Sequence, residues 1–164
     1  MPPSEPPLAQ LDRLLKQGDA VGALRVADQM LAQSKRTFGA WLGRAVALMQ
    51  LGQIAEADAA VAEALKLSPG DAQAKLIQAM LADSKAEAYA AECMVLDAAR
   101  RRDAGESVST FASCAKLFAT EMVGRVADRA VQIHGGAGYM DEYAVSRFYR
   151  DVRLFRIYEG TSQI

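Results

Sequence analysis

Hydrophobic residues recur every three or four positions along nearly the whole chain, which is the spacing of one face of a helix. Aligning residues 17–31 with residues 51–65 places Gly18 over Gly52 and Leu31 over Leu65, at a constant offset of 34 residues. This offset is typical of repeated helical hairpins. Glycine permits the tight turn of such a hairpin, and a small residue such as alanine permits its two helices to cross closely. The pattern therefore predicts two antiparallel helical hairpins over residues 4–71.

A longer helix is predicted directly after the hairpins. Residues 71–103 contain neither glycine nor proline and are rich in strong helix formers, so we expect one helix of roughly 30 residues. The small size of the apolar side chains on one of its faces favours close packing against further helices. These positions are Ile77, Met80, Leu81, Ser84, Ala88, Ala91, Val95 and Ala98.

The pattern predicts two more helices toward the end of the chain. The first runs from about residue 110 to residue 133, with Ser109 as its N-terminal cap. Gly135, Gly136 and Gly138 then interrupt the helical pattern, and a short helix capped by Asp141 follows. No stretch alternates as a strand would, so we expect an all-α fold.

Charge and composition exclude several classes of function. The formal net charge is -1 and the cationic residues are scattered among acidic ones, which argues against nucleic acid as a partner. No apolar run reaches the roughly 18 residues of a membrane span and no signal region opens the sequence, so we expect a cytoplasmic protein without membrane attachment. His134 is the only histidine, which rules out a zinc site built from several imidazoles. Cys93 and Cys114 are expected to be buried thiols.

The second hairpin resembles the tetratricopeptide repeat. The matching positions are Trp41, Gly52, Ala57, Ala64 and Pro69, within a unit running from residue 38 to residue 71. The resemblance extends more weakly over about residues 4–83, and Arg44 and Ala45 depart from the motif. It implies a concave groove that accepts a peptide. The groove would present Gly39, Leu42, Val46, Met49 and Gln50.

The second half of the chain resembles a different family. AKLFATEM, AVQIHGGAGY, RFYRD and RIYEGTSQI, in this order within about residues 77–164, look like the C-terminal helical domain of the acyl-CoA dehydrogenases. The resemblance implies that Glu159 is the base that removes the proton α to a thioester carbonyl. It also implies that Gly160 lets the substrate approach the backbone. It implies contacts with FAD for Gln132, Gly135, Gly136, Thr161 and Gln163.

Ordinary structural roles remain open for the same residues. By spacing alone, Glu159 is a solvated carboxylate near a chain end, and the glycines simply end a helix and turn the chain. The family's N-terminal helical domain and middle β domain have no counterpart in the sequence. Because catalysis needs base, thioester and flavin held in a preformed geometry, we expect no dehydrogenase activity and no cofactor from this chain alone, with FAD the cofactor if activity survives.

The two resemblances meet inside one predicted helix. We therefore expect domains at residues 1–71 and 72–164 that share the helix of residues 71–103. A shared helix without a flexible linker favours an engineered chimera that serves as a rigid scaffold. The alternatives are a dehydrogenase fragment that retains FAD or acyl-CoA binding, and a peptide-binding repeat module. The apolar helix faces also predict a homo-oligomer formed through the dehydrogenase-like helices.

Overall fold

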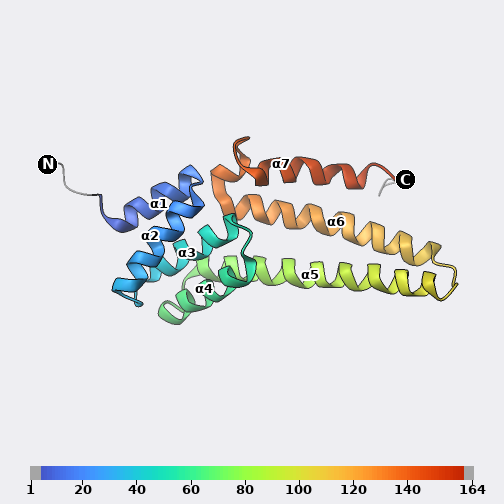
Figure 1. Ribbon diagram of the computed structural model, residues 1–164, viewed down its shortest axis with the longest axis horizontal. Helices are drawn as coiled ribbons and strands as arrows, with labels where there is room; N and C mark the ends of the chain where they lie inside the picture. Colours follow the sequence, from blue (N-terminus) through green and yellow to red (C-terminus); the bar gives the residue numbers. More distant parts are fainter. Residues whose placement is uncertain (1–4, 161–164) are drawn as a thin grey trace. The chain divides into compact units, whose positions relative to one another are not determined.

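The computed structural model describes residues 5–160, which form an all-α fold without strands, as the hydrophobic pattern predicts (Figure 1). None of its helices is both long and apolar enough to cross a membrane, and no group of three or more His, Cys, Asp or Glu side chains in the described part of the chain could hold a metal ion. The α-helices are α1 (Pro7–Gln17), α2 (Ala20–Gln33), α3 (Phe38–Gln50), α4 (Ile54–Leu67), α5 (Ala72–Asp103), α6 (Ser109–His134) and α7 (Ala144–Asp151), and two short 3₁₀ helices are η1 (Gly135–Tyr139) and η2 (Val152–Arg156).

The chain divides into two compact units. The first contains the described residues up to Leu81 together with Ile133–Ala137, and the second contains Ala82–Gln132 and the described residues from Gly138 onward. The division falls inside α5, which is a single helix of 32 residues. The prediction of one helix over residues 71–103 is therefore confirmed.

The two hairpins of the first unit turn in the same way. Gly18 and Gly52 both adopt positive φ, at 72° and 76°, which explains why glycine recurs there. In each turn the glycine N–H donates to a carbonyl three residues earlier, at 3.2 Å and 3.0 Å. The next residue donates to a carbonyl five residues earlier, at 3.0 Å and 2.9 Å. The sequence offset of 34 residues therefore corresponds to a repeated turn geometry.

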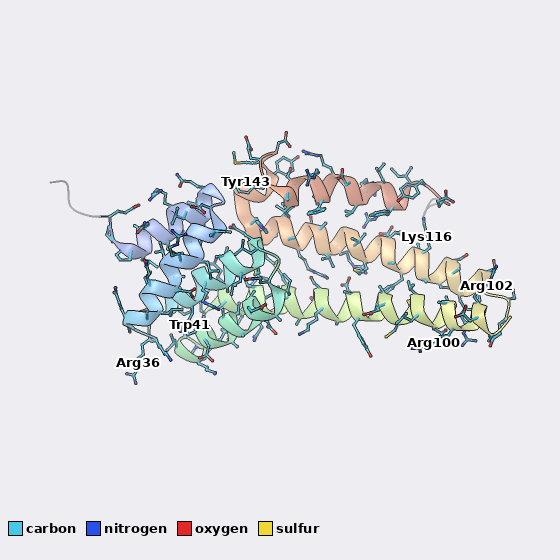
Figure 2. The ribbon with its side chains drawn as sticks, viewed as in Figure 1. Arg36, Trp41, Arg100, Arg102, Lys116 and Tyr143 are labelled. Atoms are coloured by element: carbon cyan, nitrogen blue, oxygen red, sulfur yellow. The ribbon has the colours of Figure 1, made fainter. Side chains whose placement is uncertain are left out.

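Apolar side chains close the first unit into a core. Leu48 and Val61, at 2% and 0% exposure, lie in a cluster with Ile77 and Leu81 of α5. A Cβ added to Gly43 would lie 2.5 Å from Leu11 Cδ2, so glycine on α3 leaves room for the buried Leu11 side chain of α1. Trp41, labelled in Figure 2, packs against the cluster and donates its indole N–H to the Lys35 carbonyl at 2.9 Å. The predicted hairpins thus have an apolar core made of two clusters, and the partly buried Leu24 packs against both.

The second unit buries much less. Its buried apolar residues among those described are Ala91, Ala115 and Ala127. On the predicted small-residue face of α5, Ala91 is buried, but Ala88 and Val95 are exposed. Large exposed apolar side chains of this unit include Tyr89, Leu96, Phe111, Leu117, Phe148, Leu154, Phe155 and Ile157. The expected close packing of this face is therefore only partly present within one chain.

Two smaller expectations are wrong. Cys93 and Cys114 are both exposed, because none of the residues that the structure describes covers the helix faces that carry them. Asp141 does not cap α7, which begins at Ala144 after Tyr143 and has no side-chain cap. The Asp141 carboxylate instead accepts a hydrogen bond from the Arg150 guanidinium, which holds the pKa of Asp141 below its usual value. An ion pair across the turn replaces the predicted cap.

Candidate functional site

The turn that contains Glu159 has an unusual backbone. Glu159 has φ 54°, and it is the one non-glycine residue with positive φ in the described part of the chain. Gly160 follows with φ 90°, a conformation that favours glycine. A left-handed backbone in a residue with a Cβ costs on the order of 1 kcal/mol, and such strain concentrates at functional sites. The backbone conformation therefore makes Glu159 a candidate functional residue independently of the sequence motif.

The second unit holds this turn in place from α6. Lys116 donates from Nζ to the Gly160 carbonyl, and Phe155 and Tyr158 pack edge to face with ring centroids 5.9 Å apart (Figure 2 labels Lys116). The Glu159 side chain is exposed and makes no hydrogen bond or ion pair with the described residues. The backbone of the turn is thus anchored while its carboxylate stays available to a ligand.

The predicted FAD contacts lie in an open stretch of chain. Gln132, in the last turn of α6, is exposed, and Gly135 at the start of η1 has φ 60°. A Cβ added to Gly136 would meet no atom within 4 Å. Internal packing therefore does not require glycine at residue 136, and its backbone is accessible from outside. Thr161 and Gln163 lie outside the described residues.

Gln132 and the Glu159 turn, which both belong to the second unit, are far apart in a single chain. The Glu159 turn is fixed at Lys116, and Gln132 lies 16 positions further along the same helix, which is about 24 Å at the helical rise. One chain therefore does not bring the predicted base and the predicted contact at Gln132 together.

A charged cluster joins α5 to α6 in the second unit. Glu87 accepts hydrogen bonds from Arg129 Nη2 at 2.7 Å and from Arg125 Nε at 3.1 Å. Arg129 also donates to Ser84 Oγ at 3.3 Å. The hydrogen bond from Arg129 is the largest cause that lowers the pKa of Glu87 below 4.5, and Arg125 lowers it further. Polar contacts thus connect α5 to α6 in a unit that buries few apolar side chains.

We expect Glu87→Gln to destabilise the second unit by about 1 to 2 kcal/mol at neutral pH, because it removes the shared counterion of two arginines. Since the folded state lowers the pKa of Glu87, its contribution is present above the unfolded pKa and is lost as the pH falls through the folded pKa. Urea unfolding at pH 7 and below about pH 4 measures both effects. The exposed Glu92→Gln is the control, and an equal loss in both variants would contradict the role of Glu87.

Sequence reasoning missed the arginines that surround this cluster. A cavity of about 850 Å³ lies in the second unit and is lined by Gly124, Arg125, Asp128, Arg129, Tyr149, Arg150, Val152, Arg153 and Arg156. The available signal was the spacing of the arginines: Arg125 and Arg129 are four residues apart on α6, and the arginines at 147, 150, 153 and 156 recur every three residues through α7 and η2. Nothing in the sequence showed that these two rows face one cavity.

The predicted peptide groove is present only in part. A shallow cavity of about 180 Å³ in the first unit includes Gly39, Leu42 and Val46 in its lining. Met49 is 7% exposed and belongs to the core, so it does not face a groove. Gln50 donates to the Leu15 carbonyl at 3.5 Å, and its Oε1 has no partner. Three of the five predicted groove residues therefore line this cavity.

Comparison with known proteins identifies relatives that are similar to part of this chain. The 3-(aryl)acrylate reductase of Clostridium sporogenes is 42% identical over 115 residues, which are 66% of this chain and 30% of that protein. The caffeyl-CoA reductase-Etf complex subunit CarC of Acetobacterium woodii is 47% identical over 85 residues, 52% of this chain and 22% of that protein. The chain therefore spans less than a third of the length of these relatives.

A solved structure and a family match agree with these relatives. The structure of butyryl-CoA dehydrogenase from Megasphaera elsdenii matches with a TM-score of 0.53 and 34% identity, over 84% of this chain and 35% of that one. Residues 42–164 match the family described as "Acyl-CoA dehydrogenase, C-terminal domain". This match begins inside α3, well before residue 77, where the resemblance was expected to start. The chain belongs to the acyl-CoA dehydrogenase C-terminal domain family.

Proposed function

We propose that the chain acts as the C-terminal helical part of a flavin-dependent acyl-CoA dehydrogenase, with Glu159 as the base that removes the α-proton of an acyl-CoA. The observation that carries the proposal is the strained turn: Glu159 has positive φ, Lys116 anchors the adjacent carbonyl, and the exposed carboxylate makes no hydrogen bond or ion pair with the described residues. A residue held this way has a fixed backbone and a free side chain, as a base that acts on a bound substrate requires.

The chemistry explains the type of residue. The proton α to a thioester is acidic enough for a carboxylate only where the developing enolate is stabilised and the carboxylate is desolvated. In the proposed reaction, Glu159 would take this proton onto a carboxylate oxygen, and bound FAD would supply the acceptor for the hydride from the β-carbon. Gly160 lacks a side chain, so the substrate can lie close to the backbone beside the base.

The described residues that are expected to contact FAD are exposed, so a ligand can reach them. Gln132 offers an exposed amide, and no neighbouring atom blocks the backbone at Gly135 or Gly136. Because about 24 Å of α6 separates Gln132 from the Lys116 anchor of the Glu159 turn, we propose that each flavin site takes these two groups from different copies of the chain. Thr161 and Gln163 would add contacts beside Glu159.

Self-association is therefore part of the proposal. Large apolar side chains of the second unit stand exposed, and burying them between copies would stabilise an assembly. We expect light scattering to give a multiple of the 17.6 kDa chain mass. Phe148→Ser, at a side chain that is 57% exposed on α7, should shift the mass toward one chain. Val21→Ser, 58% exposed in the first unit, is the control. A mass of one chain at every concentration would contradict self-association.

Retention of flavin tests the functional proposal. The purified chain is equilibrated with FAD, desalted, and its visible absorbance is recorded. Flavin that stays with the protein supports the proposal, whereas a colourless protein contradicts it.

A helical scaffold is the second candidate, because α5 runs unbroken for 32 residues through the segment where the two sequence resemblances overlap. In that case the function of the chain would be its shape, and the engineered fusion considered from the sequence would be its origin. The peptide-binding repeat ranks third, because the groove cavity is only about 180 Å³. Flavin retention separates the first candidate from the other two.

A further inference from the structure

The arginine-lined cavity of the second unit is large enough for a small molecule. Its volume of about 850 Å³ lies within the range of roughly 300 to 1,000 Å³ that is usual for ligand sites. Five arginines from α6, α7 and η2 line it together with Tyr149, and Asp128 is the one carboxylate among its lining residues. Neither the proposed base nor the expected FAD contacts belong to this lining.

Local geometry explains why the arginines converge. Arg125 and Arg129 are one helical turn apart on α6 and therefore share a face. Arg153 and Arg156 are three residues apart on η2, where a 3₁₀ helix aligns side chains at this spacing. A Cβ at Gly124 would lie 2.2 Å from Arg156 Nη2, so glycine allows this guanidinium to lie against α6. There Arg156 donates to the Glu121 carbonyl at 3.2 Å.

Acidic side chains outside the lining hold four of the five arginines. Glu87 pairs with Arg125 and Arg129, Asp141 pairs with Arg150, and Glu121 pairs with Arg156 at 3.1 Å. Arg153 makes no ion pair with an acidic side chain among the described residues. A guanidinium has five N–H donors, so each of the paired arginines keeps further donors for a ligand. The carboxylates thus orient the arginines and leave one unneutralised cation in the cavity wall.

We propose that this cavity binds the diphosphate group of a phosphate-bearing ligand. Arginine forks match phosphate oxygens in a bidentate manner, and several arginines on different walls suit a group with two linked phosphates better than a single carboxylate. The diphosphate can belong to free pyrophosphate or to a nucleotide such as coenzyme A or FAD. This site is distinct from the base proposed above, because neither Glu159 nor its anchor Lys116 belongs to the cavity lining.

Titration calorimetry with inorganic pyrophosphate tests the site. We expect the full chain to bind pyrophosphate and Arg153→Gln to weaken this binding about tenfold, through loss of a charge-assisted contact. Arg153→Lys keeps the charge without the fork and should fall between the two. Arg102→Gln removes the same charge at the end of α5, away from the cavity, and should bind like the unchanged protein (Figure 2).

Competition identifies the source of the diphosphate. If coenzyme A or FAD displaces pyrophosphate and Arg153→Gln weakens both, the ligand is a nucleotide; if neither displaces it, the ligand is free pyrophosphate. Both results support the site. Absence of pyrophosphate binding to the unchanged chain, or an equal affinity in Arg153→Gln with its helical circular dichroism preserved, would overturn the proposal. Glu159→Gln should leave pyrophosphate binding intact, so this site and the proposed catalysis can fail separately.

Discussion

Glu159→Gln is expected to retain bound FAD and to slow its reduction by butyryl-CoA at least about 100-fold, the lower range of what a positioned base contributes. Glutamine has nearly the same shape as glutamate, so the turn with φ 54° and the Lys116 contact to Gly160 should survive. The amide cannot accept the α-proton. Because loss of the hydride from the β-carbon depends on removal of this proton, flavin reduction should slow. Anaerobic stopped-flow absorbance measures the reduction, with butyryl-CoA chosen because a butyryl-CoA dehydrogenase is among the similar structures.

Two variants sharpen this experiment. Glu159→Asp keeps the carboxylate on a side chain that is shorter by one methylene. Flavin in this variant should be reduced at a rate between those of the unchanged protein and Glu159→Gln. Glu142→Gln removes an exposed carboxylate that makes no hydrogen bond or ion pair with the described residues, and it should react like the unchanged protein. Reduction at an undiminished rate in Glu159→Gln would exclude Glu159 as the base.

Leu48→Ala is expected to lower the free energy of unfolding of the first unit by about 3 kcal/mol. Leu48 is 2% exposed and packs in the cluster that contains Val61 and Ile77, so truncation leaves a cavity that rigid neighbours cannot fill. Urea unfolding followed by circular dichroism measures the loss through the midpoint and slope of the transition.

Leu76→Ala provides the matched control for this core variant. Leu76 lies on α5 next to the buried Ile77 but is 53% exposed, so the same truncation should cost less than about 1 kcal/mol. A loss at Leu76 as large as the loss at Leu48 would mean that the core of the first unit does not lie where the structure places it.

The helices could be predicted because their signals are local. The 32 residues of α5 contain no helix breaker, and Gly18 and Gly52 mark turns that need positive φ. Burial in the second unit could not be predicted in the same way. A pattern such as Ala91 with Val95 shows that a helix has an apolar face, but it does not show whether the same chain covers that face. The exposed thiol of Cys93 has the same cause.

The candidate sites differ in how much the sequence reveals. Glu159 was found through its motif, whereas its positive φ and its anchor at Lys116 depend on tertiary contacts that no local pattern encodes. The arginine cavity combines residues about 25 positions apart along the chain, so the spacing within α6 or within η2 was visible but their convergence was not. The position of Asp141 before a helix is typical of a cap, but its carboxylate accepts a hydrogen bond from Arg150 and does not cap α7.

The most direct test of the proposed function is the visible spectrum of the FAD-equilibrated, desalted chain before and after anaerobic addition of butyryl-CoA. The proposed role of the chain predicts bound flavin whose absorbance is bleached by the thioester. A colourless protein, or bound flavin that butyryl-CoA leaves oxidised, would contradict it.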